Sequence, residues 1–324
     1  MKVGIIGNHG SGKTTIFKAL TGIEEEHRES ISVGIIEIPD ERLDRLHSLY
    51  PEKEKVPSRV DIIDVGIFEP KNETVRNVDA YLLTIGAFYG EEPAGIWKEF
   101  KADMIISDQD LVEKRLKRIK KEHRKENERE ETLLNKVLTF LKEEDLLINS
   151  SLPKDKIIRG YNFFSFKPVF AVINISEDQD EEDFAQYIEE IEVPSLVFKG
   201  KLEADFQEIP KEERKEYMDL YGIRESATQR LIKSIYSEMG LITFFTIGEK
   251  EVRGWRLKKD SSALEAAGSI HSDMREGFIK AEVVPVEELL DAGGGKKVKE
   301  KGLIRLVGKD YKVNDGDVLK IRFA

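Results

Sequence analysis

Residues 7–14 read GNHGSGKT; they end the apolar run KVGIIG and lead into the helical pattern TTIFKALTG. This matches the pattern G-x4-GK[ST] in the context it requires, between a predicted strand and a predicted helix. Glycines let such a loop curl so that successive N–H groups point inward at a helix N-terminus. The sequence therefore predicts a phosphate-binding loop (P-loop) for a nucleoside triphosphate. The residues expected to line it are Asn8, His9, Gly10, Ser11 and Gly12.

Side chains complete the predicted phosphate site. Lys13 supplies a counter-charge, the Thr14 hydroxyl is expected on Mg²⁺, and Thr15 is expected to reach the α-phosphate region. A second Mg²⁺ ligand is expected from the strand VDIID, which ends in Asp64 and is followed by Gly66, as at a Walker-B position. The alternative is that Asp64 only caps a turn. We expect Lys13, Thr14 and Asp64 to be the catalytic residues, with Thr14 and Asp64 as metal ligands.

Composition narrows the class of protein. A chain of 324 residues predicts two or three domains. The net charge of -11 argues against nucleic-acid binding over the whole surface but leaves room for a local basic stripe. Without cysteine, neither a disulfide framework nor a thiolate metal site is possible. No apolar run reaches the length of a membrane span, and the first residues do not resemble a signal peptide, so we expect a soluble cytoplasmic protein with no membrane partner.

Short apolar runs alternate with helical patterns over the first 100 residues, which is typical of an α/β fold. The runs FKPVFAVIN and PSLVFKG at 166–174 and 194–200 predict two further strands of the same sheet. After a helical stretch near 224–239, short strands around one helix predict a small α+β module from Gly240 onward. We therefore expect a P-loop domain over 1–105 and 159–239, an insert over 106–158, and a C-terminal domain over 240–324.

The insert carries no strand pattern and is dense in charged residues. Apolar stripes on either side of the polar stretch KKEHRKENERE predict an antiparallel helical hairpin resembling a coiled coil. Its first arm is basic, and the function of this arm stays open between a solvated helix face and a stripe that contacts RNA. The cations are Lys114, Arg115, Lys117, Arg118, Lys120, Lys121, Arg124 and Lys125.

The position where GTP-binding proteins carry Asn-Lys-x-Asp reads Asn174-Ile175-Ser176-Glu177 in this chain. The carboxylate of the Asp accepts two hydrogen bonds from guanine. The longer side chain of Glu177 is displaced from that geometry, and adenine offers it an amine donor. The motif therefore impairs guanine recognition, and a GTP-specific switch is the weaker alternative.

Several segments together resemble the YchF or Obg-like ATPase family and cover nearly the whole chain. They include VGIIEIPDERLDRL at 33–46, KPVFAVINISE at 167–177 and GKLEAD at 200–205. The strongest resemblance is C-terminal, in TFFTIGEKEVRGW, AAGSIHSDMREGFIKAEV and GKDYKVNDGDVLKIRFA. The resemblance implies a P-loop G domain interrupted by a helical hairpin and followed by a ubiquitin-like TGS domain.

The resemblance also implies function. Family members look like ATP-preferring hydrolases that associate with ribosomes and translation components, which favours RNA or ribosome contact by the basic arm and the TGS domain. By position, the base would be framed by Asn174, Ile175 and Glu177. The second base-contacting loop would contain Gly200, Lys201 and Leu202.

Both switch segments of this chain are shorter than the family pattern. No threonine lies between Thr21 and Thr74, so the first switch lacks its usual ligand unless Ser30 or Ser32 replaces it. The second switch is reduced to Asp64-Val65-Gly66 followed by IFEPKNE, with no glutamine to orient a water molecule. We expect slow, Mg²⁺-dependent hydrolysis of ATP. The alternative is a module that binds the nucleotide without hydrolysing it.

Overall fold

The computed structural model separates into two compact units, each formed by two stretches of the chain. One unit comprises residues 1–34 and 61–228, and the other comprises 35–60 and 229–324. We call them the P-loop unit and the C-terminal unit. The residues that the structure describes are 1–23, 32–122, 127–152, 156–220 and 225–324.

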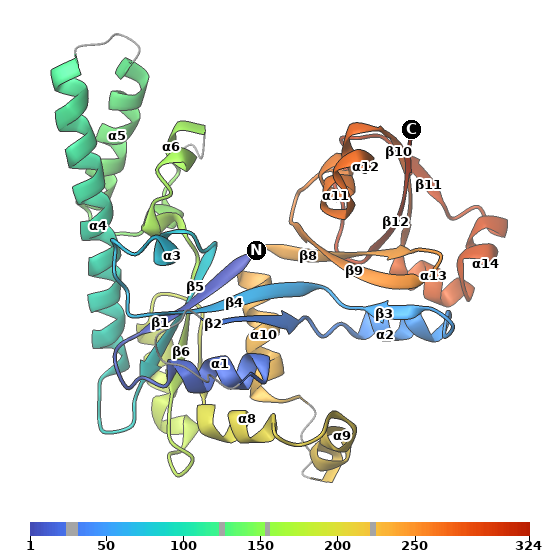
Figure 1. The fold of residues 1–324 in the computed structure, drawn as a ribbon, viewed down its shortest axis with the longest axis horizontal. Helices are drawn as coiled ribbons and strands as arrows, with labels where there is room; N and C mark the ends of the chain where they lie inside the picture. Colours follow the sequence, from blue (N-terminus) through green and yellow to red (C-terminus); the bar gives the residue numbers. More distant parts are fainter. Residues whose placement is uncertain (24–31, 123–126, 153–155, 221–224) are drawn as a thin grey trace. The chain divides into compact units, whose positions relative to one another are not determined.

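A sheet of six strands, in the order β2-β4-β1-β5-β6-β7, organises the first unit within the described residues (Figure 1). The strands around the P-loop pair in parallel, as the α/β pattern predicted: β1 pairs with β4 and β5, and β6 pairs with β5 and β7. Carboxyl ends of parallel strands share one edge, where such folds bind ligands. The strand bounds are β1 Lys2–Gly7, β2 Ser32–Glu37, β4 Arg59–Gly66, β5 Ala80–Gly86, β6 Val169–Asn174 and β7 Ser195–Phe198.

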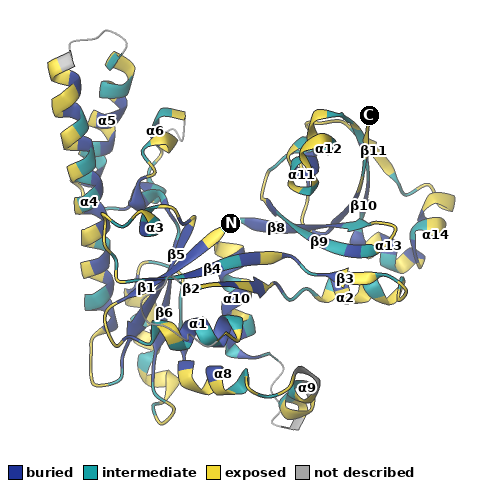
Figure 2. Cartoon of the chain, viewed as in Figure 1, coloured by how far each residue is buried: buried dark blue, intermediate teal, exposed yellow. Residues whose placement is uncertain are grey.

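Helices connect these strands and cover the sheet. β5 and β6 are buried along their whole length, which accounts for their continuous apolar sequences (Figure 2). The helices of this unit are α1 Lys13–Thr21, α3 Glu73–Arg76, α4 Pro93–Glu122, α5 Glu128–Leu141, α6 Lys156–Gly160, α7 Ala185–Glu190, α8 Gly200–Phe206 and α9 Lys211–Leu220, with the 3-10 turns η2 Leu147–Asn149, η3 Phe164–Phe166 and η4 Glu181–Phe184.

α4 and α5 run side by side as the hairpin that the sequence predicted, and α4 is longer than expected (Figure 1). It starts at Pro93, so its first turns bury Trp97 and Phe100 in the core of the P-loop unit and its later turns pack on α5. The predicted stripes meet: Val112 and Leu116 belong to the same apolar cluster as Leu134. One helix therefore serves both as a covering helix of the sheet and as an arm of the hairpin.

The C-terminal unit holds a second, mixed sheet in the order β11-β10-β12-β8-β9-β3. One apolar cluster packs on α11, whose N-terminus is fixed by a capping box between Ser262 and Glu265. The strands are β3 Glu54–Val56, β8 Leu241–Ile247, β9 Glu251–Lys258, β10 Phe278–Pro285, β11 Arg305–Val307 and β12 Asp317–Phe323. The helices are α2 Glu41–Ser48, α10 Ala227–Glu238, α11 Ala263–Ile270, α12 Ser272–Glu276, α13 Val286–Ala292 and α14 Gly295–Glu300.

Residues 35–60 contribute to this second unit although they lie early in the chain. β3 pairs in parallel with β9, and α2 places Leu43 and Leu46 against Phe245 in a second apolar cluster. The sequence pattern gave no indication of this grouping. The fold, in which helices pack on two separate sheets, is of the predicted mixed α/β class. The division into a G domain, an inserted hairpin and a TGS domain stays a prediction.

Candidate nucleotide-binding site

The loop between β1 and α1 has the backbone that a phosphate-binding loop needs. Gly12, which precedes α1, lies in the left-handed region with φ of 90°, and Gly10 has φ of 79°. A Cβ at Gly12 would collide with the side-chain nitrogen of Asn174. Asn8, His9 and Gly10 are exposed, whereas Ser11 is buried. Glycine is therefore required at position 12 both for the turn and for the close approach of Asn174.

Lys13 lies against the loop that it follows. Its Nζ donates to the carbonyl oxygens of Gly7 at 3.1 Å and Asn8 at 2.8 Å. Burial lowers the pKa of Lys13, and the nearby carboxylate of Asp64 acts in the opposite direction. The Lys13 amine is thus a partly desolvated cation held next to the main-chain N–H groups of the P-loop, where negative phosphate oxygens would stabilise its charged form.

Asp64, the predicted Walker-B acid, lies near the end of β4, which pairs with β1. It is in register with Ile5 of β1, so the ends of β1 and β4 are adjacent. Its Oδ1 accepts a hydrogen bond from the N–H of Gly66 at 3.0 Å, so the predicted turn-capping contact is also present. Thr14 is exposed at the start of α1, and Thr15 is partly buried one residue further. The carboxylate and the hydroxyl are oxygen ligands of the kind that Mg²⁺ prefers.

Asn174 connects two loops at the carboxyl edge of the sheet. Its side-chain Nδ2 donates to the carbonyl oxygen of Ser11 at 3.0 Å, and its Oδ1 accepts from the N–H of Gly200 at 3.0 Å. Only 2% of Asn174 is exposed, so both bonds are shielded from water. The structure therefore brings the P-loop and the predicted second base loop together through a single amide, which we call the Asn174 bridge.

The other predicted base residues are arranged less uniformly. Ile175 packs in the core of the unit, so a nucleotide contact from this residue would involve its main chain. Glu177 is exposed; its carbonyl oxygen accepts from Lys199 Nζ at 3.0 Å, and its carboxylate lies 3.9 Å from Lys201 Nζ. Leu202 is 51% exposed on α8. Glu177, Lys201 and Leu202 are thus accessible to a ligand.

Three residues of this edge were missed by sequence reasoning. Lys199 links the two predicted base loops through the carbonyl of Glu177, and Gln179 connects Ser176 to the carbonyl of Ala87 through its side-chain amide. The ring of Phe88 lies across Gly86, where a Cβ would be 3.0 Å from it, and reaches the neighbourhood of Gly12. An aromatic residue two positions after the end of a buried strand was the available signal for Phe88.

The second switch segment, from Asp64 onward, lies within the described residues, whereas most of the first switch segment does not. Ser30 lies outside the described residues, and Ser32 is the first residue of β2. After Gly66, Ile67 is exposed while the Phe68 ring packs against Tyr81, Phe100 and Phe164.

Part of the basic arm is neutralised within the hairpin. Lys114 pairs with Asp110, Lys117 pairs with Glu113, and Arg115 forms two hydrogen bonds with Glu130 of α5. Towards the end of α4 the side chains of Arg118, Lys120 and Lys121 are exposed. Arg124 and Lys125 lie outside the described residues. The paired cations favour the solvated-face interpretation for Lys114, Arg115 and Lys117, and the exposed Arg118 and Lys120 follow them on α4.

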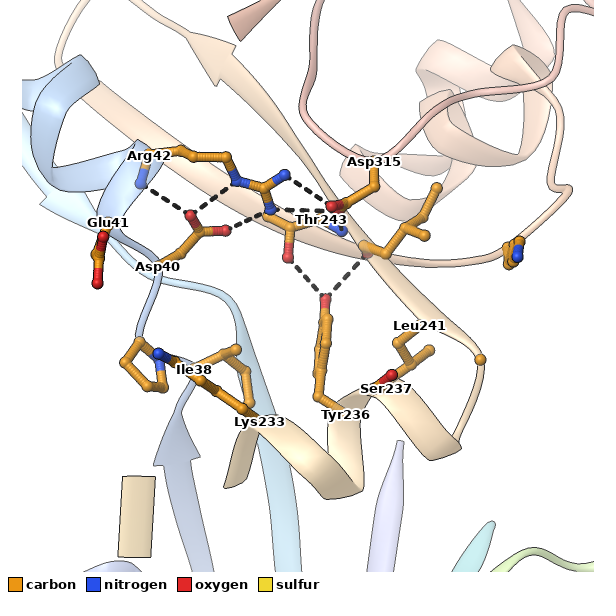
Figure 3. Close-up of a pocket in the computed structure, with 14 residues that line it drawn as sticks. Ile38, Asp40, Glu41, Arg42, Lys233, Tyr236, Ser237, Leu241, Thr243 and Asp315 are labelled. Atoms are coloured by element: carbon orange, nitrogen blue, oxygen red, sulfur yellow. Dashed lines mark hydrogen bonds and ion pairs between the residues drawn. The ribbon is translucent and has the colours of Figure 1, made fainter. Parts of the chain in front are cut away.

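A separate hollow of about 660 Å³ lies in the C-terminal unit (Figure 3). Arg42 dominates it, donating to Asp40 at 3.0 and 2.8 Å and to Asp315 at 2.7 and 3.2 Å. Tyr236 directs its hydroxyl to the carbonyl of Ile242 and the hydroxyl of Thr243. The central charges satisfy one another, so this hollow fixes residues 38–42 against β8 and is not our candidate site.

Other kinds of site find little support in the described part of the chain. It holds no cluster of three or more His, Cys, Asp or Glu side chains suited to a metal ion. Among the same residues, no helix combines the length and the apolar character that crossing a membrane requires.

Comparisons with known proteins add the following. Residues 241–324 match the family model YchF-GTPase_C, described as "Protein of unknown function (DUF933)", and residues 1–239 match the ABC transporter model. The chain is 33% identical to the "Ribosome-binding ATPase YchF" of Bacillus subtilis, covering 100% of this chain and 99% of that protein. It is 30% identical to the protein of that name from Haemophilus ducreyi, covering 99% of each. The solved structure of the Schizosaccharomyces pombe YchF GTPase has the same fold, with a TM-score of 0.85, 24% identity and coverage of 99% and 97%.

Proposed function

This chain belongs to the YchF family, with whose members it aligns over its full length, and we propose that it is an ATP-preferring, Mg²⁺-dependent nucleotide-binding protein with slow hydrolysis. The full-length relatives decide the family, because the ABC transporter model stops at residue 239 and covers only the part with the P-loop. The observation that carries the proposal is the Asn174 bridge. It joins the P-loop to the predicted second base loop, which supports their holding the two ends of one nucleotide.

The phosphate end of the nucleotide would lie in the nest formed by residues 8–12 at the N-terminus of α1. A helix N-terminus and inward N–H groups together favour anions. Lys13 would exchange its two carbonyl partners for phosphate oxygens, which form stronger, charge-assisted hydrogen bonds. Thr15 would reach the α-phosphate. Catalysis would rest on positioning and electrostatic stabilisation by these groups.

Mg²⁺ fits the oxygen donors at this edge. Thr14 and Asp64 would hold it together with phosphate oxygens, the usual arrangement for an ion that retains several waters. When bound, Mg²⁺ would neutralise charge on the phosphates. The residues of the chain keep separate roles: Lys13 balances charge, and Asp64 lies close enough to favour the protonated lysine.

The base would lie beside residues 174–177 and 200–202, and Glu177 would disfavour guanine. Its carboxylate is near Lys201, and its main chain is held by Lys199, so the loop is fixed with a Glu where guanine needs the shorter Asp. Calorimetric titration with ATP and with GTP, both with Mg²⁺, tests the proposal. Tighter binding of ATP is expected; tighter binding of GTP would overturn the base assignment, and no heat with either nucleotide would overturn the function.

The curated relatives are named ribosome-binding ATPases, and we propose a ribosome or RNA partner for this chain as well. The exposed basic end of α4, with the C-terminal unit, is the proposed contact. Cosedimentation with purified ribosomes, with and without ATP, checks this. The double variant Arg118→Glu, Lys120→Glu should reduce pelleting, whereas Lys114→Glu should change it less, because Lys114 already pairs with Asp110. Equal pelleting of all three proteins would contradict the contact.

A second candidate is a module that binds ATP without hydrolysing it. It is favoured by the missing switch threonine and by the absence of a glutamine after Gly66. Steady-state ATP turnover of the wild type and of Asp64→Ala separates the two candidates. A rate that falls in the variant supports the enzyme, and equal background rates support the binding module.

A further inference from the structure

The segment that follows Gly66 is anchored to the core at its second residue. The Phe68 ring packs edge-on against three other rings, with centroid distances of 6.2 Å to Tyr81, 5.1 Å to Phe100 and 5.0 Å to Phe164. Such perpendicular pairs add to the free energy gained from burial. These rings belong to β5, α4 and η3, and none of them belongs to the P-loop.

α3 ends the same segment and is held at both ends by side chains. It has four residues, too few for stability on its own. Its first turn is capped by Asn72, whose Oδ1 accepts from Thr74 N–H at 2.9 Å. At its other end the carbonyl oxygen of Val75 accepts from the Tyr81 hydroxyl at 2.7 Å. Carbonyls at helix ends need such partners when they are away from water.

The last residue of α3 carries the densest set of anchors. The Arg76 carbonyl accepts from Asn162 Nδ2 at 2.7 Å and from Lys167 Nζ. The guanidinium of Arg76 lies 4.0 Å from the centre of the Phe164 ring. Phe164 is held in turn by the fully buried Asp108, whose carboxylate accepts from the main-chain N–H groups of Phe164 and Ser165 at 3.0 and 2.8 Å. Phe164 and Lys167 are therefore anchors buried in the core, whereas Asn162 holds Arg76 from the surface.

The residues just before Phe68 are held in a different way. Asp64, Val65 and Gly66 end β4, Gly66 is in register with Ile6 of β1, and its N–H donates to Asp64 at 3.0 Å. Gly66 has φ of 77°, and a Cβ at this position would meet nothing within 4 Å. Ile67 is 50% exposed. Ile67 is thus the exposed residue between the end of β4 and the anchored residue Phe68.

We propose that residues 68–76 form a locked segment, which keeps its position whether or not a nucleotide is bound, and that any response of the second switch is confined to residues 64–67. The proposal deepens the proposed nucleotide-binding function and rests on it for the bound states. It assigns Phe68 and the Arg76 carbonyl as the two anchors of the lock.

Amide hydrogen exchange tests the lock by comparing the free protein with its ATP·Mg²⁺ and ADP·Mg²⁺ complexes. We expect exchange of amides 69–77 to agree across the three states within about twofold, because local opening must break the same anchors in each. A change of about tenfold or more in these amides on nucleotide binding would overturn the proposal. Calorimetry on the same samples reports binding, so loss of the nucleotide function is recognised separately.

Variants test the anchors without any nucleotide. Phe68→Ala should accelerate exchange of amides 69–77 in the free protein by about tenfold or more. Tyr81→Phe, which removes the donor to Val75 and an acceptor 3.5 Å from Lys167 Nζ, should accelerate the amides of α3 by a smaller factor and keeps the test decisive if Phe68→Ala does not fold. Lys71→Met is the matched control, because Lys71 is exposed in the same segment. Exchange in Phe68→Ala and Tyr81→Phe equal to that of the control would overturn the lock.

Discussion

Two lysines of the P-loop unit lie at opposite edges of the same sheet, and burial lowers the pKa of both. Lys13 follows β1 at the carboxyl edge, whereas Lys167 precedes β6 at the amino edge. Lys13 donates to carbonyls of an exposed loop. Lys167 donates to the Arg76 carbonyl and lies 5.5 Å and 5.6 Å from the ring centres of Tyr81 and Phe164.

The difference shows how one side-chain type serves two purposes. The partners of Lys13 are carbonyl oxygens that the oxygens of a phosphate can replace. Because the Lys13 ammonium group is only partly solvated, it should bind an anion strongly. The partners of Lys167 are fixed parts of the core, so its charge serves local structure and opposes global stability near neutral pH. Substitutions at the carboxyl edge should therefore change ligand affinity, and those at the amino edge should change stability.

The largest effect is expected for Lys13→Ala. Loss of its charge-assisted bonds to phosphate should weaken ATP binding by about 4 kcal/mol, roughly a thousandfold. The free energy of unfolding should change by only about 1 kcal/mol, because the variant loses one exposed bond, to Asn8, and one part-buried bond, to Gly7. Calorimetry and urea denaturation measure the two quantities, with Lys71→Ala as the control. A large loss of stability without loss of affinity would reverse the comparison.

At the opposite edge, Lys167→Met should alter the pH dependence of stability. Burial, with help from Arg76, holds the pKa of Lys167 at about 8, against 10.5 for an ordinary lysine, while Asp108 and Asp79 act in the other direction. Between these values the unfolded chain holds a proton that the folded chain has lost, so stability rises with pH. The wild type should therefore gain up to about 3 kcal/mol relative to the variant from pH 7.5 to 10.5.

Urea denaturation of both proteins across this pH range measures the effect. Tyr81 also faces Lys167, but burial raises the pKa of its hydroxyl, so it should stay protonated in the folded protein throughout the window. Parallel curves for wild type and variant would show that Lys167 does not titrate in this window, and the contrast between the two lysines would fail.

Asn174→Ala sharpens the comparison within the carboxyl edge. It leaves the Ser11 carbonyl and the Gly200 N–H without their buried partner, at a combined cost of about 2 kcal/mol. Part of this should appear as weaker ATP binding and part as lower stability, since the bridge shapes the site. If Asn174→Ala binds ATP as tightly as the wild type, the Asn174 bridge does not contribute to nucleotide binding.

The smallest effect is expected for Lys201→Ala. Its pair with Glu177 is exposed, and such pairs contribute less than about 1 kcal/mol. We expect a change in stability within about 0.5 kcal/mol and a few-fold loss of ATP affinity at most. A loss approaching that of Lys13→Ala would mean that Lys201 contacts the phosphates and not the base.

The features that could be predicted from the sequence are those that depend on short stretches of neighbouring residues. The P-loop, the strands of the first sheet and the hairpin follow from glycine spacing, continuous apolar runs and helical stripes, each readable within about 20 residues. The strand VDIID was recognisable as β4, and its register with β1 brings Asp64 beside Ile5; the Walker-B role of Asp64 stays a prediction.

Contacts between distant segments account for what the sequence did not predict. Asn174 carries no sign that its amide joins Ser11 to Gly200, and Ile175 could be recognised as a core residue only once β6 lay between β5 and β7. Phe68 reads as an apolar residue after a glycine, and its three aromatic partners come from β5, α4 and η3. Pairing at such separations depends on packing and not on local pattern.

β3 has a consequence for how the protein is made. This strand of three residues, with α2, completes a sheet and an apolar cluster whose other members come from residues 241–324. During synthesis from the N-terminus, residues 35–60 are made long before Phe245 and Val252, which bury their apolar side chains in the folded protein. Pairing across almost 200 residues is slow to form, and exposed apolar surface invites aggregation meanwhile. Moving residues 35–60 next to their partners by circular permutation should therefore speed the folding of this unit.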